Sequence, residues 1–141
     1  MRRAEEIGKA QSLCTRDESR IGCVAVKGGQ EVASGYNGVV GDIMPCATRG
    51  FCIRKHRNIP SGTQREVAYC ICAEQRMICE SARDGINLDG AEVYSSHMPC
   101  AVCVRLLIDC GITRVYYKSE RYVNQFAQEL ATEAGFPLIG I

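Results

Sequence analysis

The chain has 141 residues, of which 46% are hydrophobic and 23% charged, and its formal net charge is +1. These values are typical of one compact globular unit, so we expect residues 1–141 to form a single domain. A nearly neutral chain lacks the clustered Lys and Arg that binding to long nucleic acid or to an anionic membrane needs. The composition therefore favours a small-molecule ligand over a polymer or a lipid surface.

The longest apolar stretches, 21–26 and 101–108, are far shorter than the roughly 20 residues of a membrane-spanning helix. The first residues, Met-Arg-Arg-Ala-Glu-Glu, lead into acidic residues and not into the apolar segment of a signal peptide. The sequence thus predicts a cytoplasmic protein without a membrane span. In that compartment, the ten cysteines indicate metal ligation or burial before they indicate disulfides.

The first half of the chain predicts a helix and a hairpin, followed by a long irregular segment. Apolar residues at helical spacing predict a helix over 4–14. Segments 22–27 and 31–36, separated by a Gly-Gly pair, predict a β-hairpin. Residues 37–65 are rich in glycine and proline and predict a long excursion with little regular structure. Such excursions in compact domains are usually functional or held in place by another constraint.

From residue 72 onward the pattern alternates regularly between helices and strands. Each predicted helix is followed by a glycine, which suits a left-handed C-cap. This alternation predicts an α/β fold in which helices cover a sheet. The predicted helices are 72–84, 100–110 and 121–134, and the predicted strands are 91–95, 113–117 and 137–141.

Two short motifs predict a metal site. Cys100 and Cys103 lie three residues apart at the start of a predicted helix, so both thiols point to one side of its first turn. A lone C-x-x-C is also typical of redox motifs or of buried structural cysteines. The motif Cys72-Ala-Glu74 adds a third thiol and a carboxylate. Three protein ligands leave a tetrahedral zinc with an open fourth position for water, as in catalytic sites, and Glu74 can take up and return a proton there.

Taken together, the two motifs match the three-cysteine form of the zinc deaminase signature, H-x-E followed by P-C-x-x-C. The chain resembles this family, and within it most closely the deoxycytidylate deaminases. The resemblance implies hydrolytic deamination of a cytosine nucleotide, with dCMP converted to dUMP and ammonia. Cys72, Cys100 and Cys103 would hold the catalytic Zn²⁺ while Glu74 shuttles protons. Further matching segments are 22–26, 35–38, 46–52, 59–62, 91–94 and 110–116.

The same resemblance implies a cytidine deaminase-like fold, a three-layer α/β/α sandwich with a mixed sheet of about five strands. It also implies a homo-oligomer, with regulation by nucleoside triphosphates near Gly35–Gly38. In the related enzymes this turn lines the nucleotide pocket, so Asn37, with Tyr36 and Gly38 beside it, is the candidate for contacts to base or sugar. His97, close to the inferred metal, is a further substrate-binding candidate. The alternatives are a glycine turn that ends a strand and a partly buried histidine.

Basic residues are candidates for a nucleotide phosphate, since an Arg fork matches phosphate oxygens. They are Arg54 to Arg57 in the excursion, and Arg16 and Arg20 ahead of the first strand. The alternative is a solvated charged loop.

Two positions depart from the deoxycytidylate deaminase pattern. Its members usually carry His where this chain has Cys72, and Asn-Ala where it has Arg76-Met77, whereas Cys-Ala-Glu is closer to the free cytidine deaminases. Deamination of a free nucleoside, a free base or a modified base therefore stays open. A second alternative is a non-catalytic scaffold with a closed four-cysteine zinc site, although such a site has no need of Glu74. A third alternative is deamination of RNA or DNA, although the chain lacks the basic grooves and stacking aromatics that this requires.

The remaining expectations concern the other cysteines and one arginine. Some deoxycytidylate deaminases carry a second, structural zinc, and Cys14, Cys46, Cys52 and Cys70 could hold one that fixes the long excursion. Three thiolates give zinc a net charge of −1, so a cation nearby should offset it. Arg76, one helical turn after Cys72, is expected to donate to a thiolate. The alternative is a solvent-exposed helix arginine.

Overall fold

The structure is a computed structural model that describes residues 1–16, 19–60, 63–119 and 124–141. Residues 61–62, which belong to the predicted excursion 37–65 and to the matching segment 59–62, and residues 121–123 of the last predicted helix lie outside these ranges. In chain order the elements are α1 (Arg2–Gln11), β1 (Gly22–Lys27), β2 (Gln30–Tyr36), β3 (Gly38–Val39), α2 (Cys46–Arg49), α3 (Ile53–His56), η2 (Arg65–Val67), β4 (Cys70–Ile71), α4 (Ala73–Asp84), β5 (Glu92–His97), α5 (Ala101–Asp109), β6 (Arg114–Ser119), α6 (Gln125–Glu133) and β7 (Leu138–Gly140).

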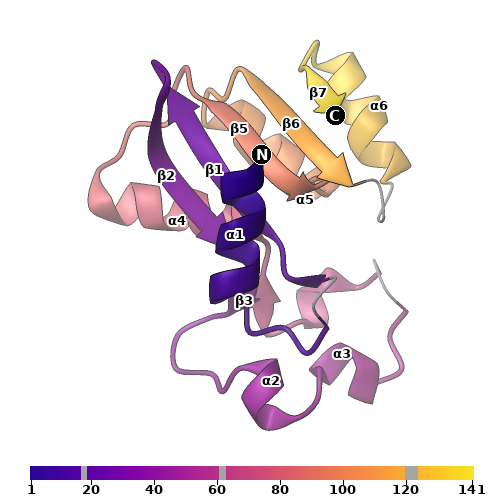
Figure 1. The fold of residues 1–141 in the computed structure, drawn as a ribbon. Coiled ribbons are helices and arrows are strands. Elements are labelled where there is room, and N and C mark those ends of the chain that lie inside the picture. The colour runs from indigo at the N-terminus through magenta and orange to yellow at the C-terminus, as the bar shows by residue number, and fades with distance from the viewer. Residues whose placement is uncertain (17–18, 61–62, 120–123) are drawn as a thin grey trace.

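The main sheet has five strands in the order β2-β1-β5-β6-β7. The hairpin pair β1 and β2 is antiparallel, β5 runs antiparallel to β1, and β5, β6 and β7 are parallel to one another. Helix α1 packs on one face of the sheet, and α4, α5 and α6 cover the other (Figure 1). The predicted three-layer α/β/α sandwich with a mixed sheet is therefore confirmed.

Apolar side chains of β1 divide between the two faces because successive strand residues point to opposite sides. Val24 packs against Ala4 and Ile7 of α1, while Cys23 belongs to the larger core beneath α4, α5 and α6. That larger core also holds Met77 of α4, which is fully buried. It fixes the helices that follow the two cysteine motifs on one face of the sheet.

Several predicted boundaries differ from the observed ones. Helix α1 ends at Gln11 and not at residue 14, so Cys14 lies in the loop that follows it. The last helix begins at Gln125, because the side chain of Asn124 caps it by accepting the N–H of Ala127 at 2.9 Å. Strands β5 and β6 extend to residues 97 and 119, since their parallel pairing continues that far. The C-cap of α4 at Gly85 is left-handed, as predicted.

The long excursion forms a separate region, here called the loop lobe (residues 38–71). It holds the short helices α2, α3 and η2, and Figure 1 shows it below the sheet. Its ends are tied together, because Gly38 of β3 pairs with Ile71 of β4. The chain therefore leaves β2 and returns to the start of α4 at neighbouring points.

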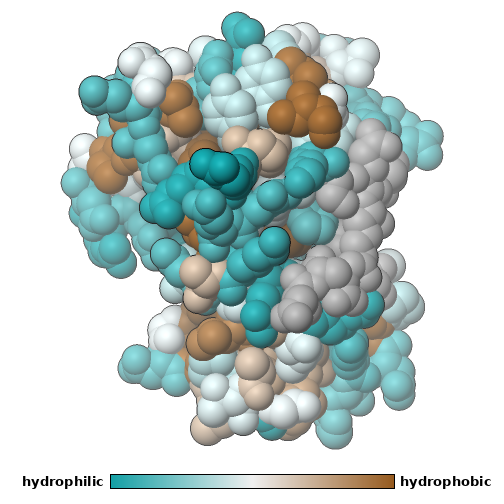
Figure 2. Space-filling model, in the orientation of Figure 1, coloured by the Kyte–Doolittle hydropathy of each residue, from teal (hydrophilic) through white to brown (hydrophobic). Residues whose placement is uncertain are grey.

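The face that carries α1 is mostly hydrophilic in the space-filling view (Figure 2). Exposed apolar side chains occur on the loop lobe, including Val40, Met44 and Phe51. In the described ranges, none of the helices combines the length and the apolarity of a membrane span.

Helix α4 lies against β2 so closely that the strand needs a glycine at position 35. A Cβ on Gly35 would overlap the carbonyl oxygen of Ala73 and would lie 2.7 Å from the backbone nitrogen of Met77. These are backbone atoms of α4, so they cannot move aside without moving the helix. Gly35 thus sets the distance between the hairpin and the helix that follows Cys72.

We expect Gly35→Ala to lower the free energy of unfolding by roughly 2–3 kcal/mol, as overpacking of a dense core does, and the thermal midpoint by roughly 10 °C. Gly29→Ala is the control, because it has open space around it and only its positive φ of 80° strains an alanine, at about 1 kcal/mol. Thermal melts followed by circular dichroism measure both. Equal midpoints in the two variants would rule out the tight contact at Gly35.

Candidate metal centre

Three thiols converge at the N-termini of α4 and α5. Cys72 is the N-cap of α4 and Cys100 the N-cap of α5, while Cys103 lies in the first turn of α5. The sulfurs of Cys100 and Cys103 are 3.5 Å apart, and all three sulfurs lie within 4.8 Å of one another. A tetrahedral zinc with Zn–S bonds of about 2.3 Å separates its sulfur ligands by roughly 3.8 Å. This thiol triad (Cys72, Cys100 and Cys103) therefore fits the size of a zinc site.

The triad favours a thiolate at Cys100. Hydrogen bonds with the Cys103 and Cys72 side chains lower the pKa of Cys100 far below its ordinary value. The same hydrogen bonding with Cys100 raises the pKa of Cys72 and of Cys103. A divalent cation favours the deprotonated form of every thiol that binds it, so metal binding here releases protons.

Glu74 lies beside the triad and is nearly inaccessible, with 3% of its surface exposed. The hydroxyl of Ser95 on β5 donates to Glu74 Oε1 at 2.8 Å. Burial raises the pKa of Glu74, with a further contribution from the negative charge of Cys100. A carboxyl whose pKa lies nearer to neutrality is suited both to accept a proton and to return it.

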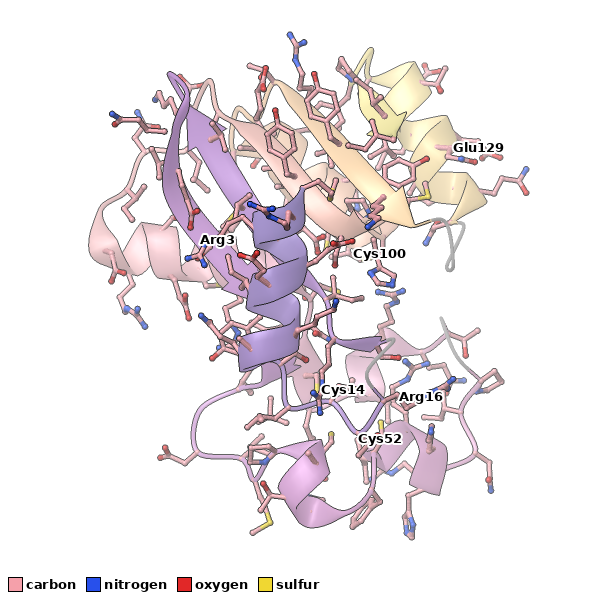
Figure 3. All side chains as sticks on the ribbon, in the orientation of Figure 1. Arg3, Cys14, Arg16, Cys52, Cys100 and Glu129 are labelled. Carbon is pink, nitrogen blue, oxygen red and sulfur yellow. The ribbon has the colours of Figure 1, made fainter. Side chains whose placement is uncertain are left out.

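A cavity of about 510 Å³ opens at the triad. The start of α4, the residues Met98 to Cys100 with Val102, and Arg54, Arg65 and Glu66 of the loop lobe are among the residues that line it. Its volume is in the range of sites for small organic ligands. In the side-chain view, Cys100 lies where the end of the sheet meets the loop lobe (Figure 3). The cavity thus spans the junction of these two parts.

Of the four residues predicted to contact substrate, only Asn37 lines this cavity among the described residues. Its Oδ1 accepts the N–H of Ile21 and its Nδ2 donates to the carbonyl of Ser19, both at 2.8 Å. The Asn37 side chain therefore holds in place the segment that leads into β1.

The other three predicted contacts lie elsewhere. Tyr36 and Gly38 line a neighbouring cavity of about 430 Å³, which Asn37 also borders. The Nδ1 atom of His97 lies 3.2 Å from the hydroxyl oxygen of Ser96.

The basic segment predicted for phosphate binding reaches the metal-side cavity through Arg54 alone among its described residues. The guanidinium of Arg54 donates to the carbonyl of Pro60 at 2.6 Å and to that of Thr63. Arg20 donates to the carbonyl of Cys14 at 3.4 Å. Both side chains thus hold backbone carbonyls of their own chain.

The prediction that Arg76 donates to a zinc thiolate is wrong. Its Nε and Nη2 donate to the carbonyls of Tyr36 and Val39 at 3.0 and 2.8 Å, and its Nη1 lies 3.8 Å from Glu80. The guanidinium also stacks over the Tyr36 ring, 4.5 Å from its centroid. Helical spacing places Arg76 on the α4 face that meets the end of β2, where carbonyls need donors. Arg76 therefore connects α4 to the hairpin and to β3.

A different arginine, Arg65 of η2, reaches the triad. Its Nη1 donates to Cys72 Sγ at 3.5 Å. Burial by itself would lower the pKa of Arg65, but the negative charges of Cys100 and Cys72 outweigh this and raise it. The sequence held no signal for this contact, because Arg65 reaches Cys72 through the fold of the loop lobe and not through helical spacing. Its position follows Gln64, whose left-handed backbone turns the chain.

The four remaining candidate ligands come from separate segments and lie in one region. The sulfurs of Cys46 and Cys70 are 4.0 Å apart. Burial raises the pKa of both thiols, that of Cys70 to about 12, and the charges of Cys14 and Cys52 contribute to each shift. Figure 3 shows Cys14 and Cys52 beside the loop-lobe helices. In the described chain, however, only the thiol triad has three ligand atoms within 4.8 Å of one another.

The sheet order, the helices on both faces and the metal-capable triad define a protein of the cytidine deaminase-like fold class. A solved structure with this fold is the dCMP deaminase of the cyanophage S-TIM5 in complex with dCMP and dUMP. It superposes with a TM-score of 0.72 over 99% of this chain and 92% of that chain, at 22% sequence identity. Residues 1–119 match the family model for the cytidine and deoxycytidylate deaminase zinc-binding region. The chain belongs to this family.

Two curated relatives are similar over most of the chain. ComE operon protein 2 of Bacillus subtilis is 33% identical over 125 residues, which cover 89% of this chain and 60% of the relative. Deoxycytidylate deaminase of Schizosaccharomyces pombe is 29% identical over 119 residues, which cover 84% of this chain and 36% of the relative. The chain therefore spans less than two thirds of the length of these relatives. The family is zinc-binding, and the thiol triad is a cluster that can hold the metal ion.

Removal of the Arg65 guanidinium should weaken zinc binding, because a zinc held by three thiolates carries excess negative charge that Arg65 offsets. We expect Arg65→Ala to lower zinc affinity 10- to 100-fold, as loss of a partner that hydrogen-bonds to a metal ligand typically does. Competition against a chelator measures this change in zinc affinity.

Arg65→Lys, which keeps the positive charge, should lose less zinc affinity than Arg65→Ala. In a Cys72→His background the excess charge and the sulfur acceptor are both gone, so Arg65→Ala should change affinity little. Equal losses in both backgrounds would contradict the charge explanation.

Proposed function

We propose that this chain is a zinc-dependent hydrolase that deaminates a cytosine nucleotide, converting dCMP and water to dUMP and ammonia, and that residues 1–141 act as one domain. The observation that carries the proposal is the buried Glu74 carboxyl beside three convergent thiols, on the wall of a cavity of about 510 Å³. The names of the S. pombe and cyanophage relatives favour dCMP as the substrate.

In the proposed mechanism, Cys72, Cys100 and Cys103 would hold the zinc, which would supply Lewis-acid activation of water. Glu74 takes one proton from water as the water oxygen bonds to the ring carbon, and it passes this proton to the adjacent ring nitrogen. It then takes the proton of the new hydroxyl and gives it to the exocyclic nitrogen, so the ring carbonyl forms as the C–N bond breaks and ammonia leaves. The raised pKa of Glu74 supports this double role. Its burial supports it further, since few waters compete for the proton.

We propose that Asn37 is the substrate contact of the turn after β2, because it alone of that turn lines the metal-side cavity among the described residues. Tyr36 and Gly38 shape the other side of the same turn. His97 precedes Met98, which does line the metal-side cavity. The proposal that His97 contacts substrate rests on this neighbour alone, because His97 itself is not among the residues that line the cavity in the described part of the chain.

A homo-oligomer in the cytoplasm is the proposed working form. The side chains of Val102 and Leu106, one turn apart on α5, are 42% and 38% exposed, which supports burial against a second copy.

The catalytic assignment predicts that Glu74→Gln loses activity by roughly 10²–10⁴-fold, because a neutral amide cannot accept the proton from water. Its zinc content and thermal midpoint should stay those of the wild type. The matched control is Glu80→Gln on the same helix, since Glu80 pairs with Arg76 and lies outside the cavity lining that the structure describes. Ammonia release with dCMP measures both variants. Turnover by Glu74→Gln within a few-fold of wild type would assign proton transfer to another group.

A free nucleoside is the second candidate substrate, and one observation favours it. The arginines on the cavity wall already bond within the chain, Arg54 to backbone carbonyls and Arg65 to Cys72. Glu66 adds an exposed carboxylate to the same wall, and a carboxylate repels a phosphate. Rates of ammonia release from dCMP, CMP, deoxycytidine and cytidine separate the two candidates. A preference for the unphosphorylated pair would replace dCMP in the proposal.

We further propose a second, structural zinc held by Cys14, Cys46, Cys52 and Cys70. Convergence of four thiols from distant segments supports it, because a four-cysteine site would hold the loop lobe together.

Metal analysis of the purified protein should then give two zinc ions per chain. Cys46→Ser should retain one zinc and lose thermal stability, whereas Cys100→Ser should retain one zinc and lose activity. Cys79→Ser, at an exposed position on α4, is the control. A wild type with one zinc that Cys46→Ser leaves unchanged would remove the second site.

A further inference from the structure

Ser95 is a buried hydroxyl at the centre of the sheet. It lies on β5, paired with Cys23 of β1 on one side and Tyr117 of β6 on the other, and none of its surface is exposed. Residues of β5 alternate between the two faces, so Ser95 shares its face with Val93 of the larger core. A hydroxyl at such a place costs free energy unless it has a hydrogen-bond partner.

The partner of Ser95 is the carboxyl of Glu74. The hydroxyl donates to Oε1 at 2.8 Å, and both groups are shielded from water. A hydrogen bond to an ionised acceptor is roughly twice as strong as one between neutral groups. The contact joins β5 to the first turn of α4, so the rigid strand holds one oxygen of the carboxyl.

Because Ser95 fixes one carboxyl oxygen of Glu74, the other oxygen is the one available for proton transfer. A carboxyl rotates about its terminal bond with little preference, so an unattached Glu74 would present either oxygen in several directions. Because Ser95 holds Oε1, we infer that Oε2 is the oxygen that exchanges a proton with a ligand in the cavity that Glu74 lines. The carboxyl also hydrogen-bonds with the side chain of Cys103, beside the same cavity. Proton transfer needs heavy atoms within hydrogen-bond reach, about 2.6–3.2 Å. A fixed carboxyl keeps this geometry from one turnover to the next.

We propose that Ser95 is a positioning residue for the deamination reaction, one that anchors Glu74 Oε1 and thereby leaves Oε2 as the oxygen that accepts and returns the proton. This inference rests on the proposed function. Ser95 contacts the carboxyl and not the substrate, so its loss affects the chemical step more than binding.

The neighbouring serine provides a matched control. Ser96 is nearly as buried, with 5% of its surface exposed, but its hydroxyl accepts the backbone N–H of Gly22 at 3.2 Å. The Ser96 side chain points to the face of the sheet that carries α1, and its hydroxyl connects β5 to the start of β1. The Ser96 hydroxyl also lies 3.2 Å from His97 Nδ1, so its removal deletes at least as much hydrogen bonding from the same strand as removal of the Ser95 hydroxyl. Only Ser95 touches Glu74.

The experiment compares steady-state kinetics of Ser95→Ala, Ser95→Thr and Ser96→Ala with the wild type, on the nucleotide or nucleoside that the wild type deaminates fastest. We expect Ser95→Ala to lower kcat roughly 10- to 100-fold, the effect of one lost hydrogen bond to a charged group, with KM within twofold of wild type. Ser95→Thr keeps the hydroxyl and should restore kcat to within a few-fold. Ser96→Ala should lower the thermal midpoint and leave kcat within twofold, because an effect through its neighbour His97, a proposed substrate contact, would appear in KM.

Zinc content and thermal midpoint accompany each measurement, so that a folding defect is recognised. If Ser95→Ala does not fold, Ser95→Cys replaces it, because a thiol fills the space and donates only weakly; its kcat should fall at least fivefold. A folded Ser95→Ala or Ser95→Cys with wild-type kcat, or a folded Ser95→Thr as slow as the alanine variant, would overturn the role of Ser95 alone. A wild type that deaminates none of the four substrates would overturn the proposed function and this inference with it.

Discussion

The site depends on two helices that begin side by side on one face of the sheet. Because α4 and α5 both pack on the larger core, their N-caps, Cys72 and Cys100, meet at one end of that sheet. Helix N-termini carry partial positive charge, so the packing of the core brings the thiols together at a place where the negative charge of metal-bound sulfur is stabilised. Gly35 keeps α4 at the required depth. A change that shifts either helix therefore acts on the metal centre, even when it lies far from the sulfurs.

A second layer of interactions comes from parts of the chain distant in sequence. Strand β5 supplies Ser95 to Glu74, and the loop lobe supplies Arg65 to Cys72. The first is a rigid element and the second a loop element, so the carboxyl and the thiolate are supported in different ways. The rigid strand suits Glu74, because proton transfer needs fixed geometry. The loop suits Cys72, because neutralising its charge needs only a cation nearby.

The sequence predicted those features that depend on spacing within one helix or on alternation along the chain. The hairpin, the sheet covered by helices and the common direction of Cys100 and Cys103 belong to this group. The mixed sheet and the assignment of Cys72, Cys100 and Cys103 to one catalytic site came instead from the resemblance to the zinc deaminases. Side-chain direction between elements could not be predicted. Arg76 had the expected spacing, but the carbonyls at the end of β2 took its donors. Likewise, Ser95 and Arg65 act through contacts across 21 and 7 residues of chain that no local pattern encodes.

The pairing of β3 with β4 has a consequence for how the loop lobe can change over time. Gly38 and Ile71 pair across the two short strands, so the loop lobe leaves the rest of the protein and rejoins it at the same place. Closing a longer loop costs little, about 0.6 kcal/mol for each doubling of its length. Insertions and deletions can therefore accumulate between these two points while α4 stays where it is. The length of the loop lobe is limited only by those of its residues that contact the rest of the protein, above all Arg65, which must still reach Cys72.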